Sequence, residues 1–224
     1  MSDHRNVIKI YRSLLPVAAL YGAGVRLRNF FFDKGILREH TFSVPVICIG
    51  NLTVGGTGKT PHTEYLIRLL RPEYQVAVLS RGYKRKSKGF VVGNPETPIG
   101  KIGDEPYQML HKFPDIYVAV DEDRCEGIRR LTDGHTAPGT RVILLDDAFQ
   151  HRYVKPGFSI LLTDYNRLIT RDKLLPAGRL REPVGGKRRA DIILVSKCPS
   201  GLTEEEQKAI QKEIAPAPNQ SLFY

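Results

Sequence analysis

Short apolar runs alternate with longer helix-compatible stretches from residue 44 to the end of the chain. The apolar runs, rich in β-branched residues, are 46–49, 76–79, 117–120, 142–145, 159–162 and 192–195. Strands that are apolar throughout are buried on both faces. The stretches that favour helix are 60–70, 105–112, 122–131 and 204–214. This alternation predicts an α/β fold with a doubly wound, mostly parallel sheet covered by helices on both faces.

The composition is compatible with such a core. The chain has 224 residues, of which 41% are hydrophobic and 26% charged, and this excludes wholesale disorder, a collagen-like repeat and a disulfide-stapled mini-fold. Its three cysteines, Cys48, Cys125 and Cys198, are far apart and form no CxxC pair. They support neither a disulfide framework nor a cysteine-based zinc site, and they fit a reducing, cytoplasmic compartment.

The positive charge is concentrated in three segments. The formal net charge is +10, and Lys and Arg outnumber Asp and Glu in residues 1–45, 81–101 and 167–189. Such clustering indicates an anionic partner, either nucleic acid, a phosphorylated substrate or an anionic membrane surface, and solvated loops are the alternative. The segment 81–101, rich in Lys and Gly, predicts a mobile excursion rather than a core element.

The N-terminal segment predicts an amphipathic helix. Its apolar run, 14–25, would be about 18 Å long as a helix, too short for a hydrocarbon core of about 30 Å. Arg26, Arg28 and three phenylalanines at 30–32 follow in place of a signal-peptide cleavage site. We therefore expect residues 1–42 to form a membrane-interface helical segment and 43–224 a separate core. A helix docked on its own domain is the alternative.

The strongest chemical motif follows the first predicted strand. The phosphate-binding candidates at its end are Thr53, Val54, Gly55, Gly56, Thr57, Gly58, Lys59 and Thr60. A strand, a Gly-rich loop and GKT opening a helix form a P-loop, in which backbone N–H groups cradle phosphates. Lys59 would reach the β- and γ-phosphates of ATP, and the Thr60 hydroxyl would hold Mg²⁺. The strict pattern has Gly where this chain has Thr53.

An acidic pair follows the fourth predicted strand. Asp146 and Asp147 come directly after the apolar run 142–145, at the carboxyl end of a strand, where sheets of this type present ligands. A carboxylate there can hold the Mg²⁺ that bridges the β- and γ-phosphates. Without a cation, adjacent carboxylates would repel each other.

Further motifs in the same order give the chain a family resemblance. They are SRGY at 80–83, GDEP at 103–106, DDAFQHR at 146–152 and LLPAGRLREP at 174–183, together with GNLTVGGTGKTP at 50–61. With these motifs, residues 10–224 resemble the tetraacyldisaccharide 4′-kinases, the lipid A 4′-kinases of Gram-negative bacteria. Thr53 agrees with that family, in which the acidic motif usually reads DDGFQHR, so Ala148 departs from it.

The resemblance implies a reaction and roles for individual residues. The chain would be a peripheral enzyme at the cytoplasmic face of the inner membrane. It would use ATP with Mg²⁺ to phosphorylate the 4′-hydroxyl of a tetraacyl disaccharide 1-phosphate. Lys59, Asp146 and Asp147 would act on the phosphates and metal, and Asp104 would orient or deprotonate the sugar hydroxyl. Second-tier substrate candidates are Tyr83, Gln150, His151, Arg179 and Arg181. Taken singly, Asp104 could instead cap a helix.

Members of that family continue into a smaller C-terminal domain, whose histidine is thought to assist the reaction. Residues 221–224 read as the start of a strand, so we expect an N-terminal domain that binds ATP–Mg²⁺ but phosphorylates lipid poorly.

Two other function classes remain open. A P-loop ATPase or GTPase switch acting on a protein partner would share the loop and Asp146. Ser196 and Lys197 weakly resemble a base-reading loop, but Pro199 stands where guanine recognition needs Asp. A nucleic-acid module would interleave aromatic and basic residues, whereas the aromatics here cluster at 30–32, so we expect no nucleic-acid partner. The sequence leaves the oligomeric state open.

Overall fold

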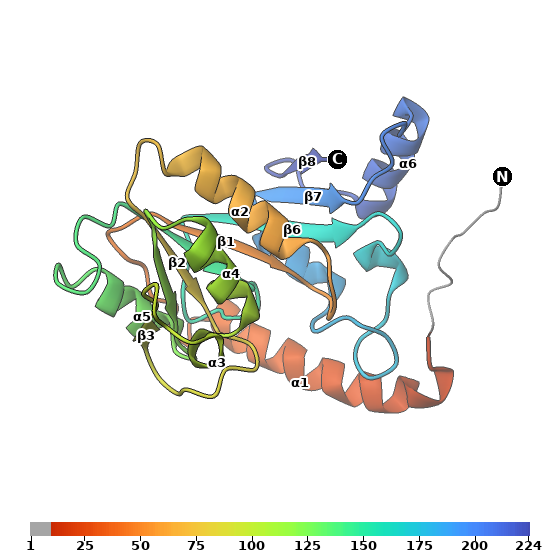
Figure 1. Cartoon of the computed structure of the whole chain (residues 1–224). Helices are drawn as coiled ribbons and strands as arrows, with labels where there is room; N and C mark the ends of the chain where they lie inside the picture. Colours follow the sequence, from red (N-terminus) through yellow and green to blue (C-terminus); the bar gives the residue numbers. More distant parts are fainter. Residues whose placement is uncertain (1–9) are drawn as a thin grey trace. The chain divides into compact units, whose positions relative to one another are not determined.

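The computed structural model describes residues 10–224 (Figure 1). The chain has two compact units. The first, here called the α2–α5 unit, contains residues 38–49 and 59–158. The second, the α1–α6 unit, contains residues 50–58, residues 159–224 and the described part of the segment that ends at Leu37. The loop predicted to bind phosphate therefore belongs to the α1–α6 unit, and the helix that follows it belongs to the α2–α5 unit.

The α2–α5 unit is built on a mostly parallel sheet with the strand order β3-β4-β2-β5-β1. The strands are β1 (Val46–Asn51), β2 (Val76–Ser80), β3 (Val91–Val92), β4 (Tyr117–Val120) and β5 (Val142–Asp146). Ala77 of β2 lies opposite Tyr117 of β4 and Ile143 of β5 in parallel register, and only β3 pairs antiparallel, with β4. The four longer strands confirm the predicted runs.

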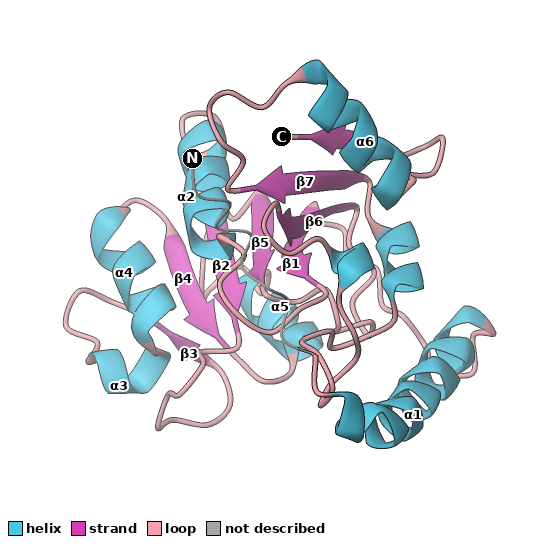
Figure 2. Cartoon of the chain, turned by 90° about the vertical axis from the view of Figure 1, so that its right-hand side faces the viewer, coloured by secondary structure: helices cyan, strands magenta, loops and turns pink. Residues whose placement is uncertain are grey.

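Helices cover both faces of this sheet. They are α2 (Lys59–Leu70), α3 (Ile99–Ile102), α4 (Asp104–Lys112) and α5 (Arg124–Leu131). Figure 2 shows α3 and α4 beside β4 and β3. Ile67 of α2 and Met109 of α4 join the apolar cluster formed by Val76 and Val78 of β2. Leu79, the next residue of β2, points to the opposite face and lies against Gly127 of α5. The doubly wound arrangement is confirmed.

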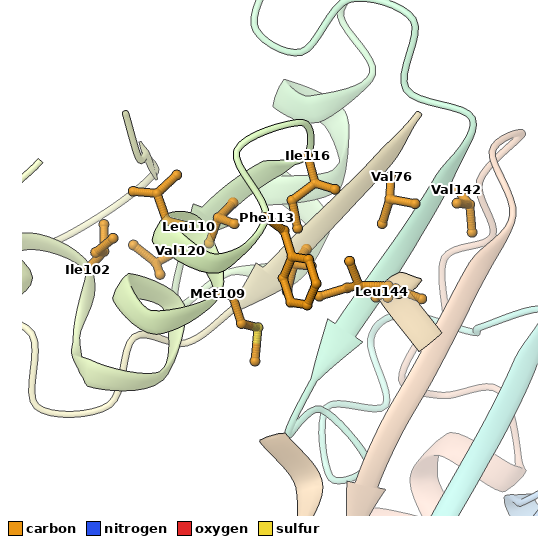
Figure 3. Packing of buried hydrophobic residues seen from close by; sticks show 12 residues of the cluster. Val76, Ile102, Met109, Leu110, Phe113, Ile116, Val120, Val142 and Leu144 are labelled. Atoms are coloured by element: carbon orange, nitrogen blue, oxygen red, sulfur yellow. The ribbon is translucent and has the colours of Figure 1, made fainter. Parts of the chain in front are cut away.

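The apolar core of the unit surrounds Phe113, which follows α4 (Figure 3). The fully or nearly buried members of this core are Ile67, Val76, Val78, Ile102, Met109, Leu110, Phe113, Ile116, Val118, Val120, Val142 and Leu144. Burying a side chain of this size contributes about 1.5–3 kcal/mol. This burial stabilises the sheet whose strand β5 carries Asp146 at its carboxyl end.

The segment 81–101 is packed against the rest of the unit, so its predicted place outside the core is wrong. It contains β3 and the start of α3, and Val91 packs against the apolar core. The almost fully buried Arg85 guanidinium forms an ion pair with Glu122 at 2.7 Å. The backbone N–H of Lys86 donates to Gly100 at 2.7 Å. The high Lys and Gly content of this segment gave no indication in the sequence of these tertiary contacts.

The α1–α6 unit contains a parallel three-stranded group and the N-terminal helix. The strands, in the order β6-β7-β8, are β6 (Phe158–Asp164), β7 (Ile192–Ser196) and β8 (Ser221–Phe223). The helices are η1 (Arg12–Leu14), α1 (Leu15–Asp33), η2 (Ile169–Arg171), η3 (Val184–Arg189) and α6 (Glu204–Ile214). β8 confirms the strand predicted at 221–224. Thr203 begins α6 with a reciprocal capping box to Glu206, which satisfies two otherwise unpaired N–H groups.

The N-terminal helix α1 is longer than its apolar run and has one anchored and one exposed side. The Tyr21 hydroxyl donates to the Arg181 carbonyl at 2.6 Å, and the Asn29 amide donates to Glu182 at 3.3 Å. Leu20 and Leu27 are 76% and 54% exposed. Residues 1–9 of the predicted helical segment lie outside the described residues. Among the described residues, no helix is long and apolar enough to cross a membrane.

Candidate functional site

The predicted phosphate loop is curled and held by a side chain from the end of β1. The Asn51 amide donates to the Thr57 hydroxyl at 2.6 Å. Gly55 and Gly58 have φ values of 111° and 83°, which side-chain-bearing residues rarely adopt. Thr53 is not among the residues with positive φ, and it forms a bridge with Leu180. A threonine is therefore accommodated where the strict pattern has glycine.

A second loop, residues 172–181, pairs with the phosphate loop and is here called the arginine loop. The Val54 N–H donates to the Arg179 carbonyl at 2.8 Å, and the Arg181 N–H donates to the Leu52 carbonyl at 2.7 Å. The Arg181 guanidinium also donates to the Asn51 carbonyl at 3.1 Å and to its side-chain oxygen. The guanidinium of Arg179 lies beside Gly55. The structure thus brings both arginines to the phosphate loop.

The buried side chain of Asp172 stabilises the arginine loop through hydrogen bonds. Its buried carboxylate accepts from the Arg167 guanidinium at 2.6 and 2.9 Å, and from the N–H groups of Lys173 at 2.7 Å and Arg179 at 3.1 Å. Burial opposes ionisation of this group, but these donors outweigh it and lower the pKa of Asp172. The ionised carboxylate therefore fixes the backbone of Arg179.

In the α2–α5 unit, the first turn of α2 faces carboxylates. Lys59 Nζ lies 3.7 Å from Asp147 Oδ1, and the Thr60 hydroxyl donates to Glu105 at 3.1 Å. Asp147 follows β5 with a φ of 47°, a left-handed conformation uncommon for a residue with a side chain. The predicted lysine and carboxylate are therefore neighbours in space.

Asp146 is fully buried and has an unsatisfied carboxylate oxygen. Thr63 donates to its Oδ1 at 2.9 Å, while Oδ2 has no hydrogen-bond partner among the described residues. Burial, together with the negative charges of Glu105 and Asp147, raises the pKa of Asp146 to about 7 against the opposing effects of Thr63 and Lys59. A divalent cation would reverse this shift, because it favours the ionised form.

These groups fit the ligand preferences of Mg²⁺. Carboxylate and hydroxyl oxygens from Asp146 and Thr60 are the hard donors that this ion takes, usually with retained waters and phosphate oxygens. The orphaned Oδ2 of Asp146 is an atom that a cation or its water shell would satisfy.

Close backbone packing joins the SRGY and GDEP motifs. A Cβ on Gly103 would lie 2.7 Å from the Tyr83 carbonyl oxygen, and a Cβ on Gly82 would lie 2.8 Å from the Ile102 carbonyl. Gly103, with a φ of 88°, is the N-cap of α4. Asp104 is therefore the first helical residue rather than the cap, and its side chain is exposed. The side chain of Tyr83 is 74% exposed.

His151 lies in a different cluster from Asp146. Ligand atoms of Asp123, Cys125 and His151 lie within 4.8 Å of one another. Asp123 caps α5 by accepting from the N–H groups of Cys125 and Glu126, so this carboxylate has a structural use. Gln150, between the acidic pair and His151, is half-buried.

Sequence reasoning missed Asn51 at the phosphate loop of the α1–α6 unit, and Thr63, Glu105 and Arg124 in the α2–α5 unit. Thr63 lies three residues after Thr60 on the same helix face, and Glu105 is adjacent to Asp104, so both had a local signal. Arg124 is 4% exposed and donates to the carbonyls of Asp121 and Glu122. Burial, with the nearby Arg81, lowers the pKa of Arg124, while Asp147 and Asp146 oppose this effect. Nothing local in the sequence distinguishes Arg124 from the other arginines.

Comparison with known proteins gives consistent matches along the chain. A family model described as tetraacyldisaccharide-1-P 4′-kinase (LpxK) matches residues 10–222. A tetraacyldisaccharide 4′-kinase of Phocaeicola vulgatus is 62% identical over 98% of this chain and 60% of its own length. The protein of the same name from Bacteroides thetaiotaomicron is 58% identical over 100% of this chain and 58% of its own length.

A solved structure matches as well. The "apo" form of LpxK from Aquifex aeolicus, crystallised in complex with ATP, superposes with a TM-score of 0.76 at 33% identity. The match covers 95% of this chain and 80% of that one. The chain spans about 60% of the length of the curated relatives it matches.

Proposed function

Because the chain belongs to the tetraacyldisaccharide-1-P 4′-kinase family, we propose that it is the nucleotide-binding part of a lipid A 4′-kinase. The proposed reaction transfers the γ-phosphoryl group of ATP to the 4′-hydroxyl of a tetraacyl disaccharide 1-phosphate. The observation that carries this proposal is the buried Asp146 with its orphaned oxygen, near Lys59 and Thr60 at the start of α2. Family membership favours this kinase over a P-loop switch acting on a protein.

The phosphate chain of ATP would be bound by residues 53–60. The N–H groups of a curled loop and the start of a helix attract anions, and the similar LpxK from Aquifex aeolicus was crystallised with ATP. Lys59 would move from Asp147 towards the β- and γ-phosphate oxygens, which carry more negative charge. The guanidinium of Arg179, beside Gly55, adds positive charge at the same loop.

Mg²⁺ would be held by Thr60 and Asp146. When bound, the ion neutralises charge on the β- and γ-phosphate oxygens. Asp146 would then stay ionised, and its hydrogen bond from Thr63 would fix the carboxylate. Asp147 would keep Lys59 oriented before the nucleotide enters.

The acceptor hydroxyl would be oriented by Asp104. This carboxylate is exposed at the first turn of α4 and adjoins Glu105, which contacts Thr60. A carboxylate in this position can accept the proton of a sugar hydroxyl as the phosphoryl group is transferred. Tyr83, Gln150 and His151 are the proposed sugar contacts, and Arg181 and further arginines of 167–189 would bind the substrate's phosphate.

The lipid nature of the acceptor suits the surface of α1. The exposed Leu20, Leu27 and Phe30 and the neighbouring Arg26 and Arg28 form a surface that could enter a membrane interface and meet anionic headgroups. We propose peripheral association with the cytoplasmic face of the inner membrane.

The test separates nucleotide binding from phosphoryl transfer. ATP–Mg²⁺ binding by the chain is measured by calorimetry, and its transfer of ³²P to tetraacyl disaccharide 1-phosphate is measured in parallel. Asp104→Ala should retain ATP affinity and lose at least about 100-fold in transfer, whereas Asp146→Ala should weaken Mg²⁺-dependent ATP binding. Absence of both ATP–Mg²⁺ binding and lipid phosphorylation in the chain would overturn the assignment.

A further inference from the structure

Two segments of the α2–α5 unit, distant in the sequence, meet at the start of α5. Asp123 is the N-cap of this helix, and its carboxylate accepts from the Cys125 N–H at 2.9 Å. The Cys125 thiol donates to the Tyr153 carbonyl at 3.5 Å, which ties the helix to the turn after β5. The same turn carries His151, whose ring centroid lies 5.8 Å from that of Tyr153. A carboxylate, a thiol and an imidazole are therefore neighbours in space.

The three side chains have the spacing of a metal site. Their ligand atoms lie within 4.8 Å of one another. Tetrahedral Zn²⁺, with bonds of about 2.0–2.3 Å, holds its ligand atoms about 3.5 Å apart, so rotations that move each atom by about 1 Å would close the set. Asp123 is exposed and His151 half-buried, and both can make this adjustment. Both capping bonds of Asp123 go to Oδ1, so Oδ2 can bind an ion while the helix cap is kept.

The chemistry of these groups selects the ion. Thiolate sulfur and imidazole nitrogen are ligands of Zn²⁺ and similar transition metals, whereas Mg²⁺ takes oxygen ligands. Cys125 is 5% exposed, and burial together with the charge of Asp123 raises the pKa of its thiol. Zn²⁺ would bind the thiolate, and the displaced thiol proton would pass to solvent.

We propose that Asp123, Cys125 and His151 form a Zn²⁺ site, with water as the fourth ligand. The N-terminus of α5 favours the ionised forms of the carboxylate and the thiolate, and the exposed Asp123 leaves a path for the ion from solvent. The site shares no residue with the Mg²⁺ site proposed at Thr60 and Asp146.

A filled site would oppose binding of the acceptor. His151 is also a proposed sugar contact, so Zn²⁺ and the sugar would compete for its ring. Occupancy would therefore lower transfer to the lipid and leave the phosphate loop intact. This consequence rests on the proposed function, whereas the metal site itself does not.

Metal binding by the chain tests the site directly. Zn²⁺ affinity is measured by calorimetry in excess Mg²⁺, which occupies sites made of oxygen ligands alone. Co²⁺ serves as a spectroscopic probe, because thiolate-to-cobalt charge transfer reports a cysteine ligand. We expect Cys125→Ser, His151→Ala and Asp123→Asn each to weaken Zn²⁺ binding at least about tenfold, and the charge-transfer band to be absent in Cys125→Ser. Asn keeps the helix cap, so Asp123→Asn tests the ligand rather than the fold.

The controls change the same residue types outside the cluster. Cys198→Ser, at a partly buried cysteine, and His111→Ala, at an exposed histidine, should retain the Zn²⁺ affinity and the cobalt spectrum of the wild type. Wild-type binding no tighter than that of Cys125→Ser would overturn the site. A charge-transfer band that is lost in Cys198→Ser and kept in Cys125→Ser would also overturn it.

Transfer of ³²P to tetraacyl disaccharide 1-phosphate tests the competition separately. Inhibition of the wild type should need at least about tenfold less Zn²⁺ than inhibition of Cys125→Ser, in proportion to the difference in affinity. Equal inhibition of the two proteins would contradict the competition for His151. Absence of transfer without Zn²⁺ would count against the proposed function and this consequence, but it would leave the metal site to the binding measurements, which contain neither ATP nor lipid.

Discussion

Single residues at this site are constrained by burial and backbone conformation more than by exposed charge. Asp146 has a hydrogen-bonded oxygen and a buried one without a partner among the described residues. Gly103 has a positive φ and no room for a side chain. Both residues lie in motifs that the sequence singled out, but their physical roles follow from neighbours distant in the chain.

A side chain at Gly103 should destabilise the fold. Gly103→Ala adds a Cβ 2.7 Å from the Tyr83 carbonyl at a φ of 88°, and we expect a loss of about 2 kcal/mol in the free energy of unfolding. Urea denaturation measures it. The control Gly24→Ala, in α1 with nothing within 4 Å of the new Cβ, should be neutral or stabilising by up to about 1 kcal/mol. Equal effects of the two substitutions would refute the steric argument.

The raised pKa of Asp146 predicts a pH-dependent stability in the absence of metal. Its pKa is about 7 in the folded chain against an ordinary value of 3.8, so between these values the folded state holds a proton that the unfolded state has lost. Stability should therefore fall as the pH rises from about 4 to 7, by at most about 4 kcal/mol from this group.

Denaturation in EDTA tests this pH dependence. Asp146→Asn should remove the fall in stability with rising pH, and Asp115→Asn, at an exposed carboxylate, should retain it. Mg²⁺ should restore more stability to the wild type at pH 8 than at pH 5, because it competes with the proton for Asp146. A wild-type slope identical to that of Asp146→Asn would contradict the assigned ionisation.

At the scale of elements, loops far apart in the sequence support one another. The arginine loop pairs with the phosphate loop through Val54 and Arg181 and is fixed by Asp172. α1 in turn binds the same stretch through Tyr21. Periodicity located the strands and helices, because it is a local property, but it carried no information about these loop-to-loop hydrogen bonds.

Breaking the Asp172 centre should destabilise the arginine loop. Asp172→Asn leaves the Arg167 guanidinium without its carboxylate, and we expect a loss of about 3 kcal/mol at pH 7. Because the pKa of Asp172 is lowered in the folded chain, this stabilisation is present above the unfolded pKa and is lost as the pH falls through the folded one. The difference from wild type, measured by urea denaturation, should shrink below about pH 4.

The control for this prediction is an exposed ion pair. Glu204→Gln removes the partner of Lys208, 3.9 Å away on α6, and should change stability by at most about 0.5 kcal/mol. A comparable loss in both variants would argue against a specific role for Asp172.

The exposed side of α1 should determine membrane binding. Leu27→Glu introduces a charge on a surface proposed to enter the interface, and we expect at least about tenfold weaker binding to phosphatidylglycerol-containing vesicles. Leu69→Glu makes the same change at a 60% exposed leucine of α2 and should bind normally. Vesicle flotation measures both, and normal binding of Leu27→Glu would mean that α1 has a purely structural role.

For the whole molecule, charge adds a long-range attraction to these local contacts. The net charge is +10, and much of the excess lies in the N-terminal, 81–101 and 167–189 segments. Such a charge distribution attracts anionic surfaces. At 0.1 M salt this attraction is largely screened beyond about 10 Å.

Vesicle binding should therefore depend on salt. Raising the salt from about 0.05 to 0.5 M should weaken binding to anionic vesicles by about tenfold or more, because each nearby Lys or Arg contributes about 1 kcal/mol at low salt. Flotation with neutral phosphatidylcholine vesicles is the control and should show little salt dependence. If binding depends neither on salt nor on headgroup charge, the electrostatic attraction is contradicted and apolar insertion alone would account for the binding.

Much of the fold was predictable from the sequence, and the site only in part. Buried strands and amphipathic helices have local periodic patterns, so six predicted strands and four predicted helices are found. The segment 81–101 was misjudged, because its anchors, such as Arg85 with Glu122, come from a different part of the chain. Lys59, Thr60 and Asp146 were named from motifs, whereas Arg124 could be seen only once its burial was known.

The sequence by itself determined the α/β class, the order of the elements, the phosphate loop and the family, since all of these depend on local patterns and motif order. Only the tertiary structure decided the strand order, the antiparallel β3, the anchoring of 81–101 and the pairing of the arginine loop with the phosphate loop. It also decided that Lys197 contacts Gly56. The physical reason is that these features depend on hydrogen bonds and desolvation between residues distant in the chain, which no local pattern encodes.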